Sequence, residues 1–197
     1  MITQPDPARD GSTWKQGWYR NAKRLDSPNF GPRPTDASID LVVLHSISLP
    51  PGVYGGDSVA RLFTNCLDWD AHPYFQSIRG IQVSAHFFID RSGELWQFVS
   101  CDARAWHAGV SSFRGRDNCN DYSIGIELEG LEGGDFEPHQ YVCLRKLLSA
   151  VARAYPLRFV FGHSDVAPGR KIDPGDGFEW GCLADVAGDI GVKLPEK

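Results

Sequence analysis

The clearest periodic pattern in the chain lies between residues 138 and 155. Apolar side chains recur there every three or four residues, at Tyr141, Leu144, Leu148, Val151 and Tyr155. This spacing places them on one stripe of an α-helix, and Pro138 suits the first turn because a backbone N–H would have no helical partner there. The pattern therefore predicts an amphipathic helix that packs one face on the core.

Short apolar or alternating runs elsewhere indicate β-strands. They are residues 41–45, 83–90, 94–99, 123–129 and 157–161. The turn sequence Arg91-Ser92-Gly93 separates the second run from the third and predicts a hairpin. A helix is expected over residues 59–66 and a turn over residues 70–75. The loose alternation of strands and helices predicts an α/β fold, a single domain in which helices flank a mixed central β-sheet.

Length and composition favour one domain. The chain has 197 residues, 42% of them hydrophobic, which is enough for one substantial core and cramped for two. Residues 1 to about 38 show no sustained period and are rich in Pro, Asp, Ser and Arg, so we expect an ordered arm that wraps the domain. Within this stretch we assign residues 1–16 to the N-terminal arm and begin the domain proper, residues 17–197, at Gly17.

Charge and cysteine usage narrow the class of partner. The formal net charge of −5 makes nucleic acid a poor candidate and favours a small-molecule substrate. No apolar run approaches the ~20 residues of a membrane span, and the first residues lack a secretion signal pattern. We therefore expect a cytoplasmic monomer with no membrane partner. The five cysteines are widely spread with no CxxC pair, which is typical of reduced, structural thiols.

The run FGHSDVAPGRKIDPG, residues 161–175, concentrates titratable side chains among prolines and glycines. His45 and His163 follow the ends of two predicted strands, and Asp173 comes ten residues after His163. Two imidazoles and a carboxylate with one open position are the ligands of many catalytic zinc sites. A single histidine, considered without the other two candidate ligands, is explained equally well as a structural residue whose hydrogen bonds are satisfied. The HExxH motif of metalloproteases and the HxE and PCxxC motifs of base deaminases are absent from the sequence.

Five runs carry a resemblance to a known family. They are HSISLPPGVYGG, VSAHFFIDRSGELWQFV, RAWHAG, NDYSIGIELEG and GHSDVAPGRKIDPG. In this order they strongly resemble the zinc N-acetylmuramoyl-L-alanine amidases of type 2, in particular those of bacterial cell-wall recycling. The family also includes phage lysozyme-like amidases and peptidoglycan recognition proteins. The resemblance spans residues 17 to 182 and implies that residues 17–197 form a zinc amidase catalytic domain.

The resemblance implies a reaction and a set of reacting groups. The reaction is hydrolysis of the amide bond between 1,6-anhydro-N-acetylmuramic acid and the L-Ala of a small muropeptide. His45, His163 and Asp173 match the Zn²⁺ ligands. Lys171 matches the lysine that stabilises the oxyanion, and Glu127 matches the acid or base that moves protons. Strand alternation puts Glu127 and Glu129 on the same face, so the pattern alone does not choose between them.

Substrate contacts are also implied, with departures from the family pattern. The matching positions are Ser46, His86, Trp106, His107 and Arg116. Trp106 is equally suited to stacking on a sugar and to a place in the core. Ser46 stands where close relatives carry Asn, and Gln82 and Asn118 stand where arginines are expected to hold stem-peptide carboxylates. We expect a nearby arginine to replace them, the candidates being Arg79, Arg114 and Arg116.

Two other functions are compatible with the resemblance. Some relatives bind peptidoglycan without hydrolysing it, and these have lost a metal ligand. Others are exported and cleave the intact cell wall. The presence of all three expected ligands together with Glu127 and Lys171 favours an enzyme, and the missing secretion signal favours a soluble, recycled substrate.

Overall fold

A six-stranded sheet forms the centre of the molecule. The computed structural model describes residues 13–196. The sheet has the strand order β12-β5-β11-β6-β7-β3. Strands β12 (Phe159–Gly162), β5 (Leu41–Ile47), β11 (Ser123–Glu129) and β6 (Phe87–Ile89) are parallel, whereas β7 (Leu95–Gln97) is antiparallel to β6 and β3 (Lys23–Arg24) is parallel to β7. The predicted mixed sheet is confirmed.

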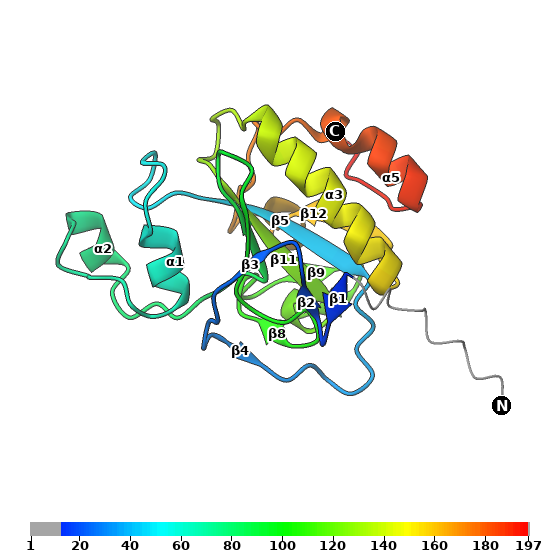
Figure 1. Ribbon diagram of the computed structural model, residues 1–197, viewed down its shortest axis with the longest axis horizontal. Helices are drawn as coiled ribbons and strands as arrows, with labels where there is room; N and C mark the ends of the chain where they lie inside the picture. The colour runs from blue at the N-terminus through cyan, green and yellow to red at the C-terminus, as the bar shows by residue number, and fades with distance from the viewer. Residues whose placement is uncertain (1–12, 197) are drawn as a thin grey trace.

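Helix α3 (Pro138–Ala154) covers one face of this sheet, with α5 (Ala184–Ile190) beside it (Figure 1). The predicted helix therefore forms with nearly the expected bounds. Its start is fixed by Pro138 in the first turn and by Gln140, whose side chain accepts the Glu137 N–H at 2.9 Å. Its apolar stripe packs in one buried cluster with residues of the two central strands, namely Val42, Leu44, Ile124, Ile126 and Leu128.

The opposite face of the two central strands carries the polar side chains. On β11 the residues between the core positions are Ser123, Gly125, Glu127 and Glu129. On β5 His45 belongs to the same set, because it alternates with Val42 and Leu44. Glu127 is the direct partner of His45 in the parallel register. The backbone ladder thus fixes the separation of these two residues.

A long excursion between β5 and β6 carries two short helices, α1 (Ser58–Phe63) and α2 (Pro73–Ser77), which project to one side of the sheet (Figure 1). Its apolar residues form a second buried cluster that includes Leu49, Leu62, Phe63 and Phe75. The predicted turn over residues 70–75 is wrong in part, because α2 begins at Pro73. The His72 imidazole caps it by accepting the Tyr74 N–H at 3.1 Å.

Three predicted strands are shorter than expected. Residues 83–86 belong to no regular strand: the Ser84 N–H donates to the Trp106 carbonyl and the His86 N–H to the Gly125 carbonyl. Regular pairing of β6 begins at Phe87, and its hairpin partner β7 covers only Leu95–Gln97. The last strand begins at Phe159, and His163 opens the one-turn helix α4 (His163–Val166) directly after it.

Three small antiparallel ribbons complete the described structure. They pair β1 (Trp14–Lys15) with β2 (Trp18–Tyr19), β4 (Phe30–Gly31) with β8 (Arg104–Ala105), and β9 (Ser112–Phe113) with β10 (Arg116–Asp117). Two 3₁₀ turns also occur, at Cys119–Asp121 and Trp180–Leu183. Most of the expected arm, residues 1–12, lies outside the described residues, and the boundary at residue 16 stays a prediction. Within residues 13–196 no helix is both long and apolar enough to cross a membrane.

Candidate metal centre

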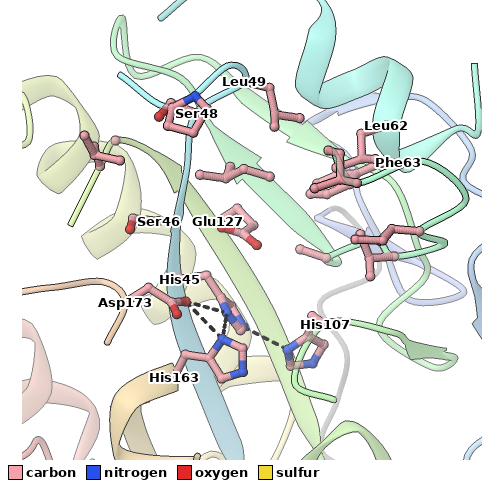
Figure 2. Close-up of a pocket in the computed structure, with 18 of the residues that line it drawn as sticks. His45, Ser46, Ser48, Leu49, Leu62, Phe63, His107, Glu127, His163 and Asp173 are labelled. Atoms are coloured by element: carbon pink, nitrogen blue, oxygen red, sulfur yellow. Dashed lines mark hydrogen bonds and ion pairs between the residues drawn. The ribbon is translucent and has the colours of Figure 1, made fainter. Parts of the chain in front are cut away.

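Three buried side chains converge where β5 and β12 end. His45 lies near the carboxyl end of β5, His163 follows β12, and Asp173 lies on the loop after α4. The His45 and His163 Nδ1 atoms are 2.9 Å apart, and the Asp173 Oδ2 atom lies 3.1 and 3.0 Å from them (Figure 2). All three residues are at most 4% exposed. The predicted ligand set is thus brought together at one sheet edge.

The chemistry of these atoms fits a cation. The His163 Nε2 atom lies 3.0 Å from the Ala108 carbonyl oxygen, which only accepts, so Nε2 carries the hydrogen and Nδ1 presents a lone pair. That lone pair faces a carboxylate oxygen and a second imidazole nitrogen. Three electron-rich atoms at this separation repel one another unless a positive charge lies between them. A tetrahedral zinc ion needs ligand atoms about 3.3 Å apart, close to the spacing seen here.

The protonation states suit metal ligands as well. Burial, helped by the neighbouring His163, lowers the pKa of His45 to about 4, so its imidazole is neutral at pH 7. Burial alone would raise the pKa of the Asp173 carboxyl, but the two imidazoles beside it outweigh this and hold the pKa below its usual range. Neutral imidazoles and an anionic carboxylate are the forms that bind zinc.

The three residues form the floor of a cavity of about 310 Å³. Glu127 and Lys171 line the same cavity, and so do Ser46, Trp106 and His107. Apolar side chains from α1, α2 and their flanking loops form a wall, among them Leu62, Phe63, Tyr74, Ile78 and Ile81. Figure 2 shows Glu127 and the three metal-ligand candidates directed toward a common space. The cavity thus joins a polar floor to an apolar wall.

Glu127 and Glu129 have different surroundings although they share a face of β11. The Glu127 Oε2 atom is buried and has no hydrogen-bond partner within the described chain. Burial, and then the charge of Asp173, raise the pKa of Glu127 well above its usual value, while Lys171 opposes the shift. Glu129 does not line the cavity, and its carboxylate accepts the N–H groups of Gly55 and Arg91. The structure thus gives the two glutamates different surroundings, a distinction that the strand pattern does not make.

Two of the five predicted substrate contacts do not reach the cavity. His86 is fully buried, its Nδ1 atom accepts the Gly125 N–H at 3.0 Å, and its Nε2 atom lies 3.1 Å from the Ala103 carbonyl oxygen. Arg116 donates to Asp40 at 2.9 Å. Asp40 precedes β5, so it lies five residues, or about 16 Å of strand, from His45 at the other end. Neither His86 nor Arg116 lines the cavity, and their predicted contacts with substrate stay predictions.

The other expected carboxylate-binding positions are also dispersed. Arg114 lines a separate surface hollow together with Arg116, and Asn118 is exposed near a third hollow. Gln82 is exposed between two residues that line the cavity, Ile81 and Val83. Arg79 lies in this same loop and forms an exposed ion pair with Asp70. Of the three candidate arginines, only Arg79 lies in a segment that borders the cavity.

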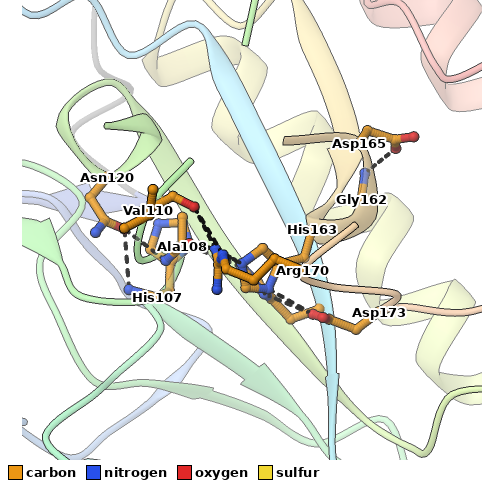
Figure 3. A network of polar contacts seen from close by, with 10 residues as sticks. His107, Ala108, Val110, Asn120, Gly162, His163, Asp165, Arg170 and Asp173 are labelled. Atoms are coloured by element: carbon orange, nitrogen blue, oxygen red, sulfur yellow. Dashed lines mark hydrogen bonds and ion pairs between the residues drawn. The ribbon is translucent and has the colours of Figure 1, made fainter. Parts of the chain in front are cut away.

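Two arginines with several backbone partners are missing from the sequence-based predictions. The Arg33 guanidinium donates to four backbone oxygens, those of Cys101, Asn120, Asp121 and Ser123. The Arg170 guanidinium donates to the Ala108 and Val110 carbonyls at 2.6 Å each (Figure 3). Arg170 belongs to the titratable run at residues 161–175, which is a signal of its importance. Nothing in the sequence around Arg33 marks it, because all its partners are distant in the chain.

Comparisons with known proteins agree with this site. Residues 35–176 match the family described as N-acetylmuramoyl-L-alanine amidase. The chain is 48% identical to the 1,6-anhydro-N-acetylmuramyl-L-alanine amidase AmpD of Citrobacter freundii over 167 residues, which cover 84% of this chain and 89% of the relative. A crystal structure of a selenomethionine derivative of AmpD superposes with a TM-score of 0.83 at 45% identity, over 87% of this chain and 97% of that one.

A more distant structure holds a ligand. It is the Escherichia coli N-acetylmuramyl-L-alanine amidase AmiD in complex with the substrate anhydro-N-acetylmuramic acid-L-Ala-D-γ-Glu-L-Lys, with a TM-score of 0.55 at 29% identity, over 79% of this chain and 60% of that one. The family match covers well over half of this chain, and the AmpD relatives align along nearly their whole length. The chain belongs to the N-acetylmuramoyl-L-alanine amidase family.

Proposed function

We propose that the protein is a zinc-dependent amidase that cleaves the bond between 1,6-anhydro-N-acetylmuramic acid and the L-Ala of a recycled muropeptide. The observation that carries the proposal is the convergence of His45, His163 and Asp173 on the floor of the cavity that Glu127 and Lys171 also line. A module that only bound peptidoglycan would not need an open metal position beside a carboxyl group whose Oε2 atom is buried without a partner in the described chain.

The residues divide the reaction between them. His45, His163 and Asp173 would hold a zinc ion, which would supply Lewis acidity for amide hydrolysis. Water attacks the lactyl carbonyl carbon, and Glu127 takes the proton that the water gives up. The C–N bond then breaks, and Glu127 returns the proton to the departing L-Ala nitrogen. The raised pKa of Glu127 suits a group that must both accept and release a proton near neutral pH.

We assign to Lys171 the stabilisation of the negative charge that develops on the carbonyl oxygen, because it lines the same cavity as the metal-ligand candidates. Replacing Lys171 with alanine is expected to lower kcat about 100-fold, equivalent to about 3 kcal/mol of barrier, with a smaller change in KM. The exposed Lys146 of α3 serves as the control, because Lys146→Ala removes the same charge away from the cavity. Steady-state kinetics separate the two constants, and a raised KM with an unchanged kcat would show that Lys171 only binds substrate.

The preferred substrate is expected to be small and anhydro-capped. The cavity of about 310 Å³ suits part of one muropeptide, and relatives named for the 1,6-anhydro sugar share 48% identity with this chain. The metal-loaded protein should release peptide from anhydro-muropeptide at least ~10-fold more efficiently, by kcat/KM, than from a reducing-end muropeptide or intact sacculus. Mass spectrometry of the products, with and without a chelator, provides the measurement.

Each outcome of this comparison discriminates between functions. An equal kcat/KM on intact sacculus and on anhydro-muropeptide would show that the protein degrades the intact cell wall and does not act in recycling. Binding of anhydro-muropeptide without product, in protein shown to hold zinc, would identify a recognition module. We retain Arg79 as the candidate partner of a stem-peptide carboxylate, since its present partner Asp70 is exposed and easily exchanged.

A further inference from the structure

Two consecutive residues, His107 and Ala108, contact the outer nitrogens of both histidine ligands. The His45 Nε2 atom lies 2.9 Å from the His107 Nδ1 atom. The His163 Nε2 atom lies 3.0 Å from the Ala108 carbonyl oxygen. The inner Nδ1 atoms of both ligands face Asp173. One short segment therefore reaches each ligand from the side opposite to the proposed metal position.

The direction of every hydrogen bond on the His45 side follows from a single backbone carbonyl. The Ser123 hydroxyl lies 2.6 Å from the Cys119 carbonyl oxygen, which has no hydrogen to give, so the hydroxyl donates its only hydrogen there. Ser123 Oγ can then only accept from His107 Nε2, 3.2 Å away. Among the described residues the ring nitrogens of His107 bond only to the Ser123 hydroxyl and the His45 imidazole, and no carboxylate faces the ring to hold a second hydrogen. With its hydrogen on Nε2, His107 presents a lone pair at Nδ1.

This lone pair determines the tautomer of His45. A lone pair at His107 Nδ1 accepts the hydrogen of His45 Nε2, which leaves the His45 Nδ1 lone pair directed at Asp173 and His163. We propose that Ser123 and His107 are positioning residues that hold His45 in its metal-binding tautomer, while the Ala108 carbonyl does the same for His163. The proposal rests on the metal site of the proposed function and extends it to residues that do not bind the metal.

The surrounding structure holds this segment in place. The Asn120 Oδ1 atom accepts the N–H groups of both His107, at 3.2 Å, and Ala108, at 2.9 Å. Arg170 donates to the Ala108 carbonyl, which therefore accepts two bonds, one on each lone pair (Figure 3). Gly125 makes room for the imidazole, since a Cβ atom there would lie 2.5 Å from His107 Cγ.

The packing of the His107 ring explains why position 125 is a glycine. Gly125 lies in the middle of β11, where a glycine weakens a strand and offers no side chain to the core. Its backbone has an ordinary conformation, because it is not among the glycines with positive φ. The close approach of the His107 ring is therefore the physical reason for a glycine at this position. Strand β11 thus contributes the space at Gly125 and the Ser123 hydroxyl, and both hold the His107 ring against His45.

The test measures tautomer and zinc affinity without substrate. In metal-free wild-type protein, ¹⁵N NMR of the imidazoles should show His45 and His163 with hydrogen on Nε2. Ser123→Ala removes only the hydroxyl and should leave His45 a mixture of tautomers, with zinc affinity about 10–100-fold weaker in a chelator competition. His107→Phe, which removes the acceptor itself, should weaken zinc binding at least as much, and His107→Gln, which restores a carbonyl acceptor, should recover part of the loss.

Ser149→Ala provides the matched control. Its hydroxyl also donates to a backbone carbonyl, that of Arg145 at 3.0 Å, but within α3 and away from the cavity. It should change neither tautomer nor zinc affinity. An unchanged His45 tautomer and unchanged affinity in Ser123→Ala and His107→Phe, both folded by circular dichroism, would overturn the proposal. If His107→Phe does not fold, Ser123→Ala decides alone. Absence of zinc binding by the wild type would instead contradict the proposed function, and the tautomer measurement would still test the inference.

Discussion

Replacing Glu127 with glutamine is expected to lower kcat about 10²–10⁴-fold while the protein keeps one zinc ion per chain. Glutamine has nearly the shape of glutamate, so the packing of β11 and the cavity wall is preserved. It cannot take a proton from the attacking water, and the amide cannot return one to the departing nitrogen. The Glu127 Oε2 atom is buried without a hydrogen-bond partner in the described chain, and the residue is the direct partner of His45 in the strand register.

Glu129→Gln is the matched control, since the two residues share a strand and a face. Glu129 accepts the Gly55 and Arg91 N–H groups, and a glutamine carbonyl can still accept one of them. This variant should unfold at a lower temperature than the wild type, with kcat within a few-fold of it. Zinc content by elemental analysis and kcat from product release are the measurements. Comparable losses of kcat in both variants would remove the assignment of proton transfer to Glu127.

The second large effect is expected from His163→Ala. Zinc content should fall from about one ion per chain to near zero, and hydrolysis should fall below detection, because two remaining ligands do not retain the ion against dilution. His163 contributes a buried imidazole whose outer nitrogen is already bonded to the Ala108 carbonyl, so the ring has one atom directed at the metal position. Asp173→Asn should act in the same direction through loss of the anionic ligand.

His139→Ala is the control for this prediction. His139 is an exposed residue in the first turn of α3, and its removal takes away an imidazole outside the cavity. It should bind zinc and turn over substrate as the wild type does. Stoichiometric zinc in purified His163→Ala would show that the ligands are wrongly assigned, whatever happens to the activity.

The hydrophobic pattern of the sequence was sufficient to predict the two strands and the helix that position the site. Residues 123–129 alternate so regularly that the predicted strand and β11 coincide, and the stripe of 138–155 predicts α3 to within one residue. The apolar run at 41–45 predicts β5, which continues two residues further. These segments bury a continuous apolar face against one another, so local preference and tertiary packing agree. The sequence could thus place His45 and His163 at the same edge of the sheet.

Other features depended on contacts that no local pattern records. The sequence of residues 83–86 predicts a strand, yet their backbone partners are Trp106 and Gly125, and His86 does not line the cavity. Arg116 lies near Asn118 in the sequence but pairs with Asp40 at the far end of β5. Ser123 resembles any strand serine until the fold brings His107 to it, 16 residues away. Side-chain partners at such separations are set by the packed structure and not by periodicity.

The second apolar cluster has a consequence for redesign. Residues between β5 and β6 build one wall of the cavity, yet their buried side chains pack mainly in a cluster distinct from the one under α3. The metal ligands, Glu127 and Lys171 all lie outside this excursion. The apolar wall of the cavity and the proposed catalytic residues are thus encoded in separate stretches of chain. An engineer could exchange residues 50–82 as a cassette, retaining the reactive floor while presenting it to a differently shaped sugar or peptide.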